Sequence, residues 1–170
     1  MSWQLAPLTA KHLEGLLAVQ QACYGAHYME AKSVFEQRLR HPRQCSLVLL
    51  QGAQVCAYAV ACRAQQGEIT PFHGNFASQG AADTLYLHDL AVWPSHTGQG
   101  LAAALLQSLL QQARVYGLAY AALVAVSGAQ TFWQRHGFAA CPLGQPLQQQ
   151  RLLRYGPEAV YMRRDIHDAS

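Results

Sequence analysis

The sequence predicts a mixed α/β fold in which helices cover a single sheet. Two apolar segments, 45–50 and 55–62, flank a turn at Gly52 and predict an antiparallel hairpin. From residue 84 onward the pattern changes to strand, helix, strand, helix and strand. With 51% hydrophobic and 12% charged residues, the 170-residue chain can bury one sizeable core, so we expect one domain over residues 1–170.

The elements before residue 84 follow from periodicity and capping residues. Residues 3–8 alternate as a strand, and Thr9 is expected to cap a helix that runs to residue 22. Ser33 is expected to cap a second helix, which ends at His41 because Pro42 follows. Residues 65–82 are polar and contain a proline and glycines, which predicts a loop.

The elements from residue 84 onward are predicted in the same way. The run at 120–126 is apolar throughout, which suits a strand covered on both faces, and Gly117 ends the helix before it. Ser127 is expected to cap the next, short helix. In chain order we expect a strand at 84–92, a helix at 100–116, a strand at 120–126, a short helix to 135, an extended segment from 138, a loop at 142–150 and a strand at 159–164.

Charge, hydropathy and cysteine usage narrow the function classes. The formal net charge of +3 comes without a basic run, so we expect no nucleic-acid partner. No apolar run is long enough to cross a bilayer and the first residues do not resemble a signal peptide, so we expect a cytoplasmic protein with no membrane contact. The five cysteines lack a C-x-x-C pair and histidines at ligand spacing, which predicts free thiols and no metal site.

Gly98 and Gly100 stand between a predicted strand and a predicted helix. Unpaired N–H groups at such a helix start can converge on an anion. No lysine follows the second glycine, so the turn is not a P-loop, but GQGLAA fits G-x-G-x-x-A and keeps a Rossmann-type dinucleotide domain as an alternative. The motif's position in mid-chain, and the apolar residues where a ribose-binding acid would follow, count against that alternative. A tight turn that only packs helix on strand is the third possibility.

Two linked motifs resemble the GCN5-related N-acetyltransferase (GNAT) family. Leu90 to Ala102 reads L-A-V-x-P-x-x-x-G-x-G-L-A and resembles that family's acetyl-CoA motif. Residues 129–138, AQTFWQRHGF, resemble A-x-x-[FL]-Y-x-x-x-G-F, and TFWQRHGF is similar to the arylalkylamine branch. The resemblance implies a mixed, mostly antiparallel central sheet with helices on both faces. It also implies a parallel pair of strands, ending at Val92 and Val126, beside a V-shaped split.

The resemblance implies acetyl-CoA as the donor and CoA as a product. It places pantetheine on the backbone of Leu90, Ala91 and Val92, and the pyrophosphate on a turn made of Thr97, Gly98, Gln99, Gly100, Leu101 and Ala102. Three positions depart from the family's pattern. Thr97 replaces an Arg or Gln, with a hydroxyl that can still donate a hydrogen bond. Val126 stands where an asparagine is usual, and Ser127 beside it could substitute in part. Trp133 replaces the tyrosine that often acts as general acid; its indole N–H can line the site but cannot titrate.

His88 is the candidate general base, because acetyl transfer needs a neutral amine and histidine titrates near neutrality. Strand alternation puts Tyr86, His88 and Leu90 on one face and Asp89 on the other, where it is expected to be structural. The arylalkylamine branch has catalytic histidines on this strand, and H-x-L-A-V places His88 on one of those positions and Tyr86, which could orient a water, on the other. A histidine bonded within the sheet is the alternative.

The acceptor wall is expected between residues 24 and 30. Its aromatic side chains would pack on an apolar amine, and the carboxylate of Glu30 would attract the ammonium group. The candidates are Tyr24, His27, Tyr28, Met29 and Glu30. We therefore expect an enzyme, monomeric or homodimeric, that acetylates a primary amine of a small molecule in a ternary complex. A catalytically weak acyl-CoA-binding module, favoured by Thr97 and Trp133, remains an alternative.

Overall fold

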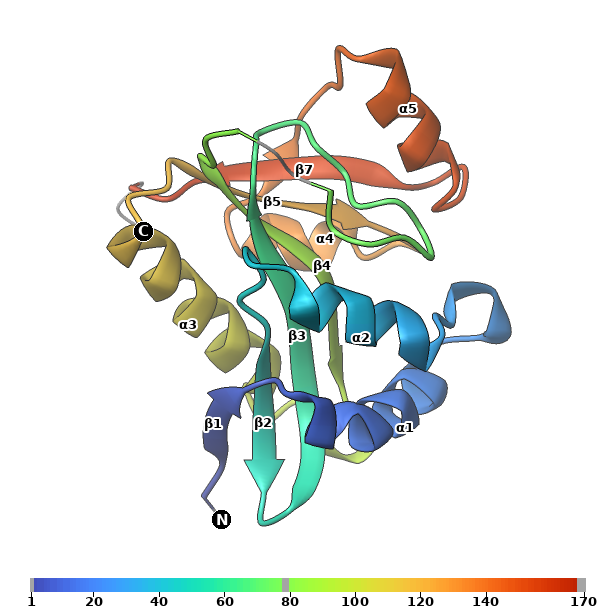
Figure 1. The fold of residues 1–170 in the computed structure, drawn as a ribbon, viewed down its shortest axis with the longest axis vertical. Helices are drawn as coiled ribbons and strands as arrows, with labels where there is room; N and C mark the ends of the chain where they lie inside the picture. The colour runs from blue at the N-terminus through green and yellow to red at the C-terminus, as the bar shows by residue number, and fades with distance from the viewer. Residues whose placement is uncertain (1, 78–79, 168–170) are drawn as a thin grey trace.

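The computed structural model describes residues 2–77 and 80–167, which form a seven-stranded sheet with helices on both faces (Figure 1). The strand order is β1-β2-β3-β4-β5-β7-β6. Only β4 and β5 are parallel neighbours, and every other neighbouring pair is antiparallel. The predicted mixed, mostly antiparallel sheet is therefore confirmed. The strands are β1 (Gln4–Pro7), β2 (Leu47–Gln51), β3 (Gln54–Ala64), β4 (Thr84–Val92), β5 (Tyr120–Ala125), β6 (Ala139–Ala140) and β7 (Val160–Asp165).

The helices follow the apolar spacing of the sequence. Leu13, Leu16 and Val19 recur at helical spacing in the first helix and are fully buried. The α-helices are α1 (Leu13–Cys23), α2 (Lys32–Arg40), α3 (Leu101–Val115), α4 (Gln130–Arg135) and α5 (Pro146–Leu153). Three short 3-10 helices are η1 (Ala10–His12), η2 (Ala26–Tyr28) and η3 (Pro94–His96).

Three local predictions were wrong. Ser33 does not cap α2, because the chain is already extended at Ala31 and the helix begins at Lys32. Ser127 does not cap α4, because its φ of 48° puts it in the left-handed region, whereas an N-cap residue is extended. The predicted loop at 142–150 contains the start of α5, for which Pro146 supplies a φ suited to a first helical turn. The loop predicted at 65–82 is confirmed, since its described residues contain no helix or strand.

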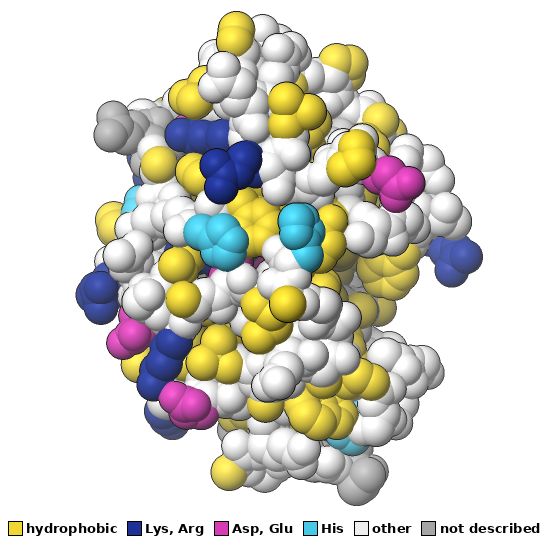
Figure 2. Space-filling view, turned by 90° about the vertical axis from the view of Figure 1, so that its right-hand side faces the viewer, with side chains coloured by type: hydrophobic (Ala, Val, Ile, Leu, Met, Phe, Trp, Pro, Cys, Tyr) yellow, Lys and Arg dark blue, Asp and Glu magenta, His cyan; other side chains and the backbone are white. Residues whose placement is uncertain are grey.

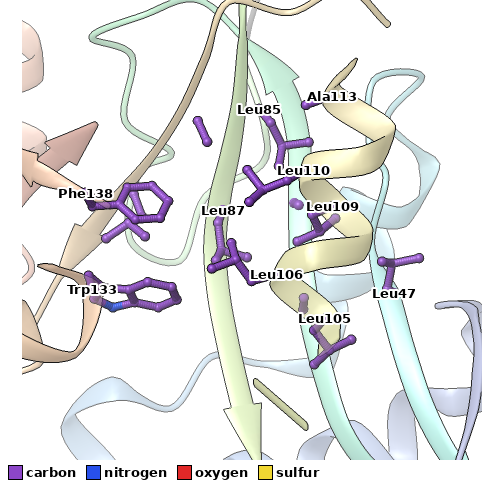
Figure 3. Packing of buried hydrophobic residues seen from close by; sticks show 14 of the residues in the cluster. Leu47, Leu85, Leu87, Leu105, Leu106, Leu109, Leu110, Ala113, Trp133 and Phe138 are labelled. Atoms are coloured by element: carbon purple, nitrogen blue, oxygen red, sulfur yellow. The ribbon is translucent and has the colours of Figure 1, made fainter. Parts of the chain in front are cut away.

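The face of the sheet under α3 holds an aliphatic core. Leu106 and Leu110 of α3 point toward Leu87 and Leu85 of β4, while Trp133 and Phe138 approach Leu87 from the other side (Figure 3). Leu105 and Leu109 of α3 belong to the same cluster. Burying such a leucine stabilises the fold by about 1.5–3 kcal/mol. Leu87, which also lines the cavity described below, is therefore held between two packed layers. The opposite face is covered by α1, α2 and the segment before β4.

The parallel pair of strands separates before either strand ends. Pairing between β4 and β5 runs from Thr84 and Tyr120 to Leu87 and Leu123, yet β4 continues to Val92. From His88 onward β4 therefore has β3 on one side and an open edge on the other. This arrangement confirms the predicted V-shaped split. The largely antiparallel sheet excludes a Rossmann-type domain, which requires a mostly parallel one.

Within residues 2–77 and 80–167, no helix combines the length and the hydropathy that crossing a bilayer requires.

Candidate active site

The split between β4 and β5 opens into a cavity of about 580 Å³. Its walls come from β4, β5, the α1–α2 connection, α4 and Tyr155 beyond α5, so segments far apart in the chain meet there. The side chains that carry chemistry in this cavity are Cys23, Tyr24, His27, Tyr28, Glu30, His88, Asp89, Ser127, Trp133 and Tyr155.

A β-bulge in β4 decides which way His88 and Asp89 face. Val60 of β3 pairs with Asp89 and the next residue, Ala61, pairs with Leu87, so His88 is the extra residue. The bulge breaks the alternation of the strand. His88 and Asp89 consequently both contact residues of the α1 and α2 side, and the prediction that Asp89 lies on the opposite face was wrong.

His88 is held by a buried ion pair. Its Nε2 lies 2.8 Å from Oε1 of Glu30, whose two oxygens also accept hydrogen bonds of 2.8 and 2.6 Å from Arg38 of α2. A fourth hydrogen bond comes from the backbone N–H of His73, 2.9 Å from Oε2. Burial alone would raise the pKa of Glu30, but the hydrogen bonds from Arg38 and His88 outweigh it and hold that pKa well below its ordinary value.

These contacts change the expected role of Glu30. A carboxylate has about four lone-pair positions, and each oxygen of Glu30 already accepts two hydrogen bonds from the protein. Its charge is also compensated by Arg38, whose side chain is only 1% exposed. Glu30 lines the cavity, but the prediction that it attracts the acceptor's ammonium group is contradicted by this internal pairing.

Asp89 is the second carboxylate of the cavity. Tyr24 donates to its Oδ1 over 2.8 Å and Tyr58 to its Oδ2 over 2.6 Å. Burial raises the pKa of Asp89, although these hydroxyl groups act in the opposite direction. Among the described residues no lysine or arginine lines the cavity, and Asp89 belongs to none of their ion pairs, whereas Glu30 is paired with Arg38.

The glycine turn has the shape that an anion requires. Gly98 and Gly100 have φ of 82° and 81°, a left-handed conformation that glycine adopts without strain. A Cβ at either position would meet nothing within 4 Å, so the turn is open to a ligand. The first hydrogen bond of α3 joins Ala104 N–H to Gly100 C=O, which leaves the earlier N–H groups of the helix without an intrahelical partner. The residues fit a pyrophosphate group.

The open edge of β4 presents backbone groups to the split. Trp93 donates its N–H to the C=O of Cys56 in β3. Because the backbone N–H and C=O groups of successive residues in a strand point to opposite sides, those of Leu90 and Val92 point away from β3. Tyr24 donates to Leu90 C=O over 3.2 Å, and Cys23 donates its thiol to Val92 C=O over 3.0 Å. Ala91 points to β3, so of the three predicted pantetheine contacts only Leu90 and Val92 lie on the open edge.

All three family departures also have a structural reading. Thr97 donates its hydroxyl to Pro94 C=O over 2.9 Å, so the prediction that it is available as a donor to the cofactor is not supported. Ser127 lines the cavity and donates to the hydroxyl of Tyr28 over 3.4 Å, linking the end of β5 to the α1–α2 connection. Trp133 lines the cavity and is 9% exposed, and the centroid of its ring lies 5.6 Å from that of Phe138.

Two predicted residues lie elsewhere. Tyr86 does not line the cavity: its ring is buried at 1% exposure, and its hydroxyl is bonded to the backbone of Thr70. It therefore cannot orient a water beside His88. Met29 also falls outside the cavity lining, although its neighbours Tyr28 and Glu30 belong to it.

The sequence reasoning missed three aromatic residues of the cavity lining, Phe72, Phe132 and Tyr155. Phe72 stacks on Tyr28 with ring centroids 6.1 Å apart and on Tyr155 at 5.2 Å, which extends the aromatic wall. Phe72 lies in the long loop and Tyr155 after α5, so neither is near a motif. An aromatic residue within a polar loop was the one available signal for Phe72.

Metal chemistry finds no support in the described residues, where no group of three or more His, Cys, Asp or Glu side chains could hold an ion. All five cysteines are free, as predicted.

Comparison with solved structures shows the fold. The chain is similar to the ribosomal-protein-S18-alanine N-acetyltransferase from Escherichia coli (19% identity, 99% of this chain and 97% of that one, TM-score 0.72). It is also similar to the loading GNATL domain of CurA from Lyngbya majuscula (15% identity, 98% and 98%, TM-score 0.74). A third neighbour is the PaiA N-acetyltransferase from Thermoplasma acidophilum in complex with coenzyme A (13% identity, 97% and 99%, TM-score 0.69).

Comparison of sequences shows the family. No curated protein sequence matches the chain. The model of the Acetyltransferase (GNAT) family matches residues 13–138, a range that contains the glycine turn, the bulged strand and Trp133. That range is most of the chain. It includes the residues that fit CoA, and the fold around them is shared with GNAT structures. The chain therefore belongs to the GNAT acetyltransferase family and is an enzyme that uses acetyl-CoA as its acyl donor.

Proposed function

We propose that this enzyme transfers the acetyl group of acetyl-CoA directly to a primary amine of a small molecule, with His88 as general base. The observation that carries the proposal is the position of His88. It lies on the bulge where β4 leaves β5, in the cavity that the donor and the acceptor would share.

The backbone and the glycine turn would hold the donor. The open edge of β4 at Leu90 and Val92 offers hydrogen bonds to the pantetheine amides, and the N–H groups from Gly98 to Ala102 would hold the pyrophosphate. Acetyl-CoA supplies a thioester carbonyl that an amine can attack.

His88 would make the amine nucleophilic. The amine nitrogen attacks the thioester carbon, the proton of the amine passes to His88, and the carbon–sulfur bond breaks with release of the thiolate. Trp133 cannot supply a proton to this thiolate, so water would protonate it. Both substrates must be present together, as a ternary complex requires.

The aromatic wall and Asp89 indicate the acceptor class. Tyr28, Phe72 and Tyr155 offer stacked faces to an apolar or aromatic amine, and Asp89 would attract its ammonium group in place of Glu30. Among the residues that the structure describes, the cavity lining provides no lysine or arginine for a substrate carboxylate. On the face shown in Figure 2, Lys and Arg side chains form small groups and no continuous basic surface for a polyanion. These features support an aromatic monoamine, as does the likeness of TFWQRHGF to the arylalkylamine branch.

The test is CoA release from acetyl-CoA over a panel of amines. We expect turnover with arylalkylamines, weaker turnover with polyamines, and little with free amino acids. Preference for a peptide would overturn the small-molecule acceptor. The His88→Ala variant should lose activity while keeping its affinity for acetyl-CoA. Full activity in that variant would remove His88 from the mechanism, and absence of turnover with every amine would favour an acyl-CoA-binding module.

A further inference from the structure

The ion pair of Arg38 and Glu30 behind His88 is buried and extensively hydrogen-bonded. Arg38 and Glu30 are 1% and 5% exposed, and removing two charges from water is unfavourable unless hydrogen bonds satisfy them. Here the carboxylate accepts four hydrogen bonds. One comes from the N–H of His73, whose φ of 63° is uncommon for a residue other than glycine. The chain thus holds the carboxylate of Glu30 in one position against His88.

This contact assigns the hydrogen on the imidazole ring. The ionised carboxylate of Glu30 can only accept hydrogen bonds. Since Nε2 of His88 lies 2.8 Å from its Oε1, Nε2 must be the nitrogen that carries the hydrogen. In the neutral ring, Nδ1 is then the nitrogen with a free lone pair.

That second nitrogen has no partner. Nδ1 of His88 is buried, and none of the described residues forms a hydrogen bond with it. Buried polar atoms of native proteins are rarely unpaired, and exceptions occur at functional sites. The ring itself lines the cavity, with Phe76 and Tyr155 edge-on to it at centroid distances of 6.5 and 6.3 Å. The two aromatic rings and Glu30 keep the imidazole from turning.

We propose that Glu30, clamped by Arg38, is a positioning residue that fixes His88 in the tautomer with hydrogen on Nε2, so that Nδ1 is the atom that takes the proton of the acceptor amine. The inference rests on the proposed role of His88 as base and adds the atom that acts and the residues that select it. When Nδ1 takes the proton, the ring becomes a cation against the Glu30 carboxylate, which stabilises the charge formed. The other charged or titratable groups that face this pair are Arg38, His73 and Asp89. The ring of Tyr155 lies edge-on to the imidazole.

The first experiment uses the unmodified full chain. Nitrogen-15 NMR of the imidazole groups, with the His88 signals identified by their loss in His88→Gln, distinguishes a protonated from an unprotonated ring nitrogen. At a pH where the ring is neutral we expect hydrogen on Nε2 and none on Nδ1. Hydrogen on Nδ1 would overturn the proposal, whatever the variants do.

The second experiment removes the carboxylate charge. Glu30→Gln should lower kcat by about 100-fold, the lower end of what a general base contributes. The KM for acetyl-CoA should stay unchanged, and the His88 spectrum should show a mixture of tautomers. The matched control is Glu14→Gln, which removes an exposed carboxylate paired with Lys32 and should change neither value. A fall in kcat with an unchanged tautomer would show a merely structural role and overturn the proposal.

Two further variants keep the test decisive. If Glu30→Gln does not fold, Arg38→Lys retains the positive charge but loses the two-pronged contact, and it should shift the tautomer in the same direction. His88→Ala separates the two proposals. If His88→Ala retains activity, His88 is not the base and both proposals fail. If His88→Ala loses activity but Glu30→Gln keeps its kcat and its His88 tautomer, only the positioning role of Glu30 is overturned.

Discussion

Replacing Gly100 with alanine tests how the glycine turn binds the cofactor. Gly100 is the residue before α3 and has a φ of 81°. The left-handed conformation costs an L-residue about 1–2 kcal/mol, and the added Cβ meets nothing within 4 Å, so no clash adds to this strain. For a chain of this length we expect the melting temperature to fall by about 2–8 °C.

The same substitution should weaken cofactor binding. The Cβ would stand at the start of α3, where N–H groups without intrahelical partners converge. Losing one hydrogen bond to a charged group removes about 1.5–3 kcal/mol, so the Kd for CoA should rise by at least about tenfold. Isothermal titration calorimetry with CoA and acetyl-CoA measures this change, and thermal unfolding without ligand measures the loss of stability.

Gly117 provides the matched control at the other end of α3. It also has a positive φ, of 70°, with open space around its Cβ position. Gly117→Ala should therefore lose similar stability and keep its affinity for CoA. Equal losses of affinity in the two variants, or an unchanged Kd in Gly100→Ala, would refute the assignment of the turn to the pyrophosphate.

Further predictions concern the core, the ion pair and Trp133. Leu109→Ala, at a position with 0% exposure, should lower the free energy of unfolding by about 2.7–5 kcal/mol in urea, whereas Leu153→Ala, at 72% exposure, should stay within about 0.5 kcal/mol. The pKa of Glu30 is lower in the folded chain than its ordinary value of about 4.3, so ionised Glu30 stabilises the fold at pH values above about 4.3. This contribution is lost as the pH falls from that value toward the folded-state pKa. Urea unfolding at pH 7 and pH 4 should accordingly show a larger loss in the wild type than in Glu30→Gln, and equal losses would contradict the ionised pair. Trp133→Phe should keep kcat within a few-fold, because the indole N–H donates no proton, and a large fall in kcat would assign the N–H a role. Trp133→Ala should lower the free energy of unfolding by about 3–5 kcal/mol.

Local patterns in the sequence were sufficient for most of the architecture. The hairpin of β2 and β3, the helix α3 and the strands around it follow from apolar periodicity and glycine positions, which act over a few residues. The glycine turn proposed for the cofactor was recognisable for the same reason, because it is continuous in the chain and has glycine at two positions of positive φ. Helix α5 was missed because its Gln-rich sequence has little apolar contrast.

The acceptor side of the site depends on contacts between distant segments. Phe72, Tyr155 and Arg38 come from a loop, a helix end and a separate helix, and no local pattern joins them to His88. The largest difference arises from one residue of β4. Alternation predicts opposite faces for His88 and Asp89, whereas the bulge opposite Val60 and Ala61 turns both into one cavity.

The sequence by itself determined the family, and it pointed to the glycine turn as the candidate acetyl-CoA site and to His88 as the candidate base, since each rests on residues close together in the chain. Only the tertiary structure decided that Tyr86 faces away, that Glu30 is an ion-pair partner and that Nδ1 of His88 is the unpartnered nitrogen. Those outcomes depend on the register between strands and on which side chains meet in the interior. A bulge or a buried hydrogen bond between residues some 58 positions apart leaves no periodic trace in the sequence.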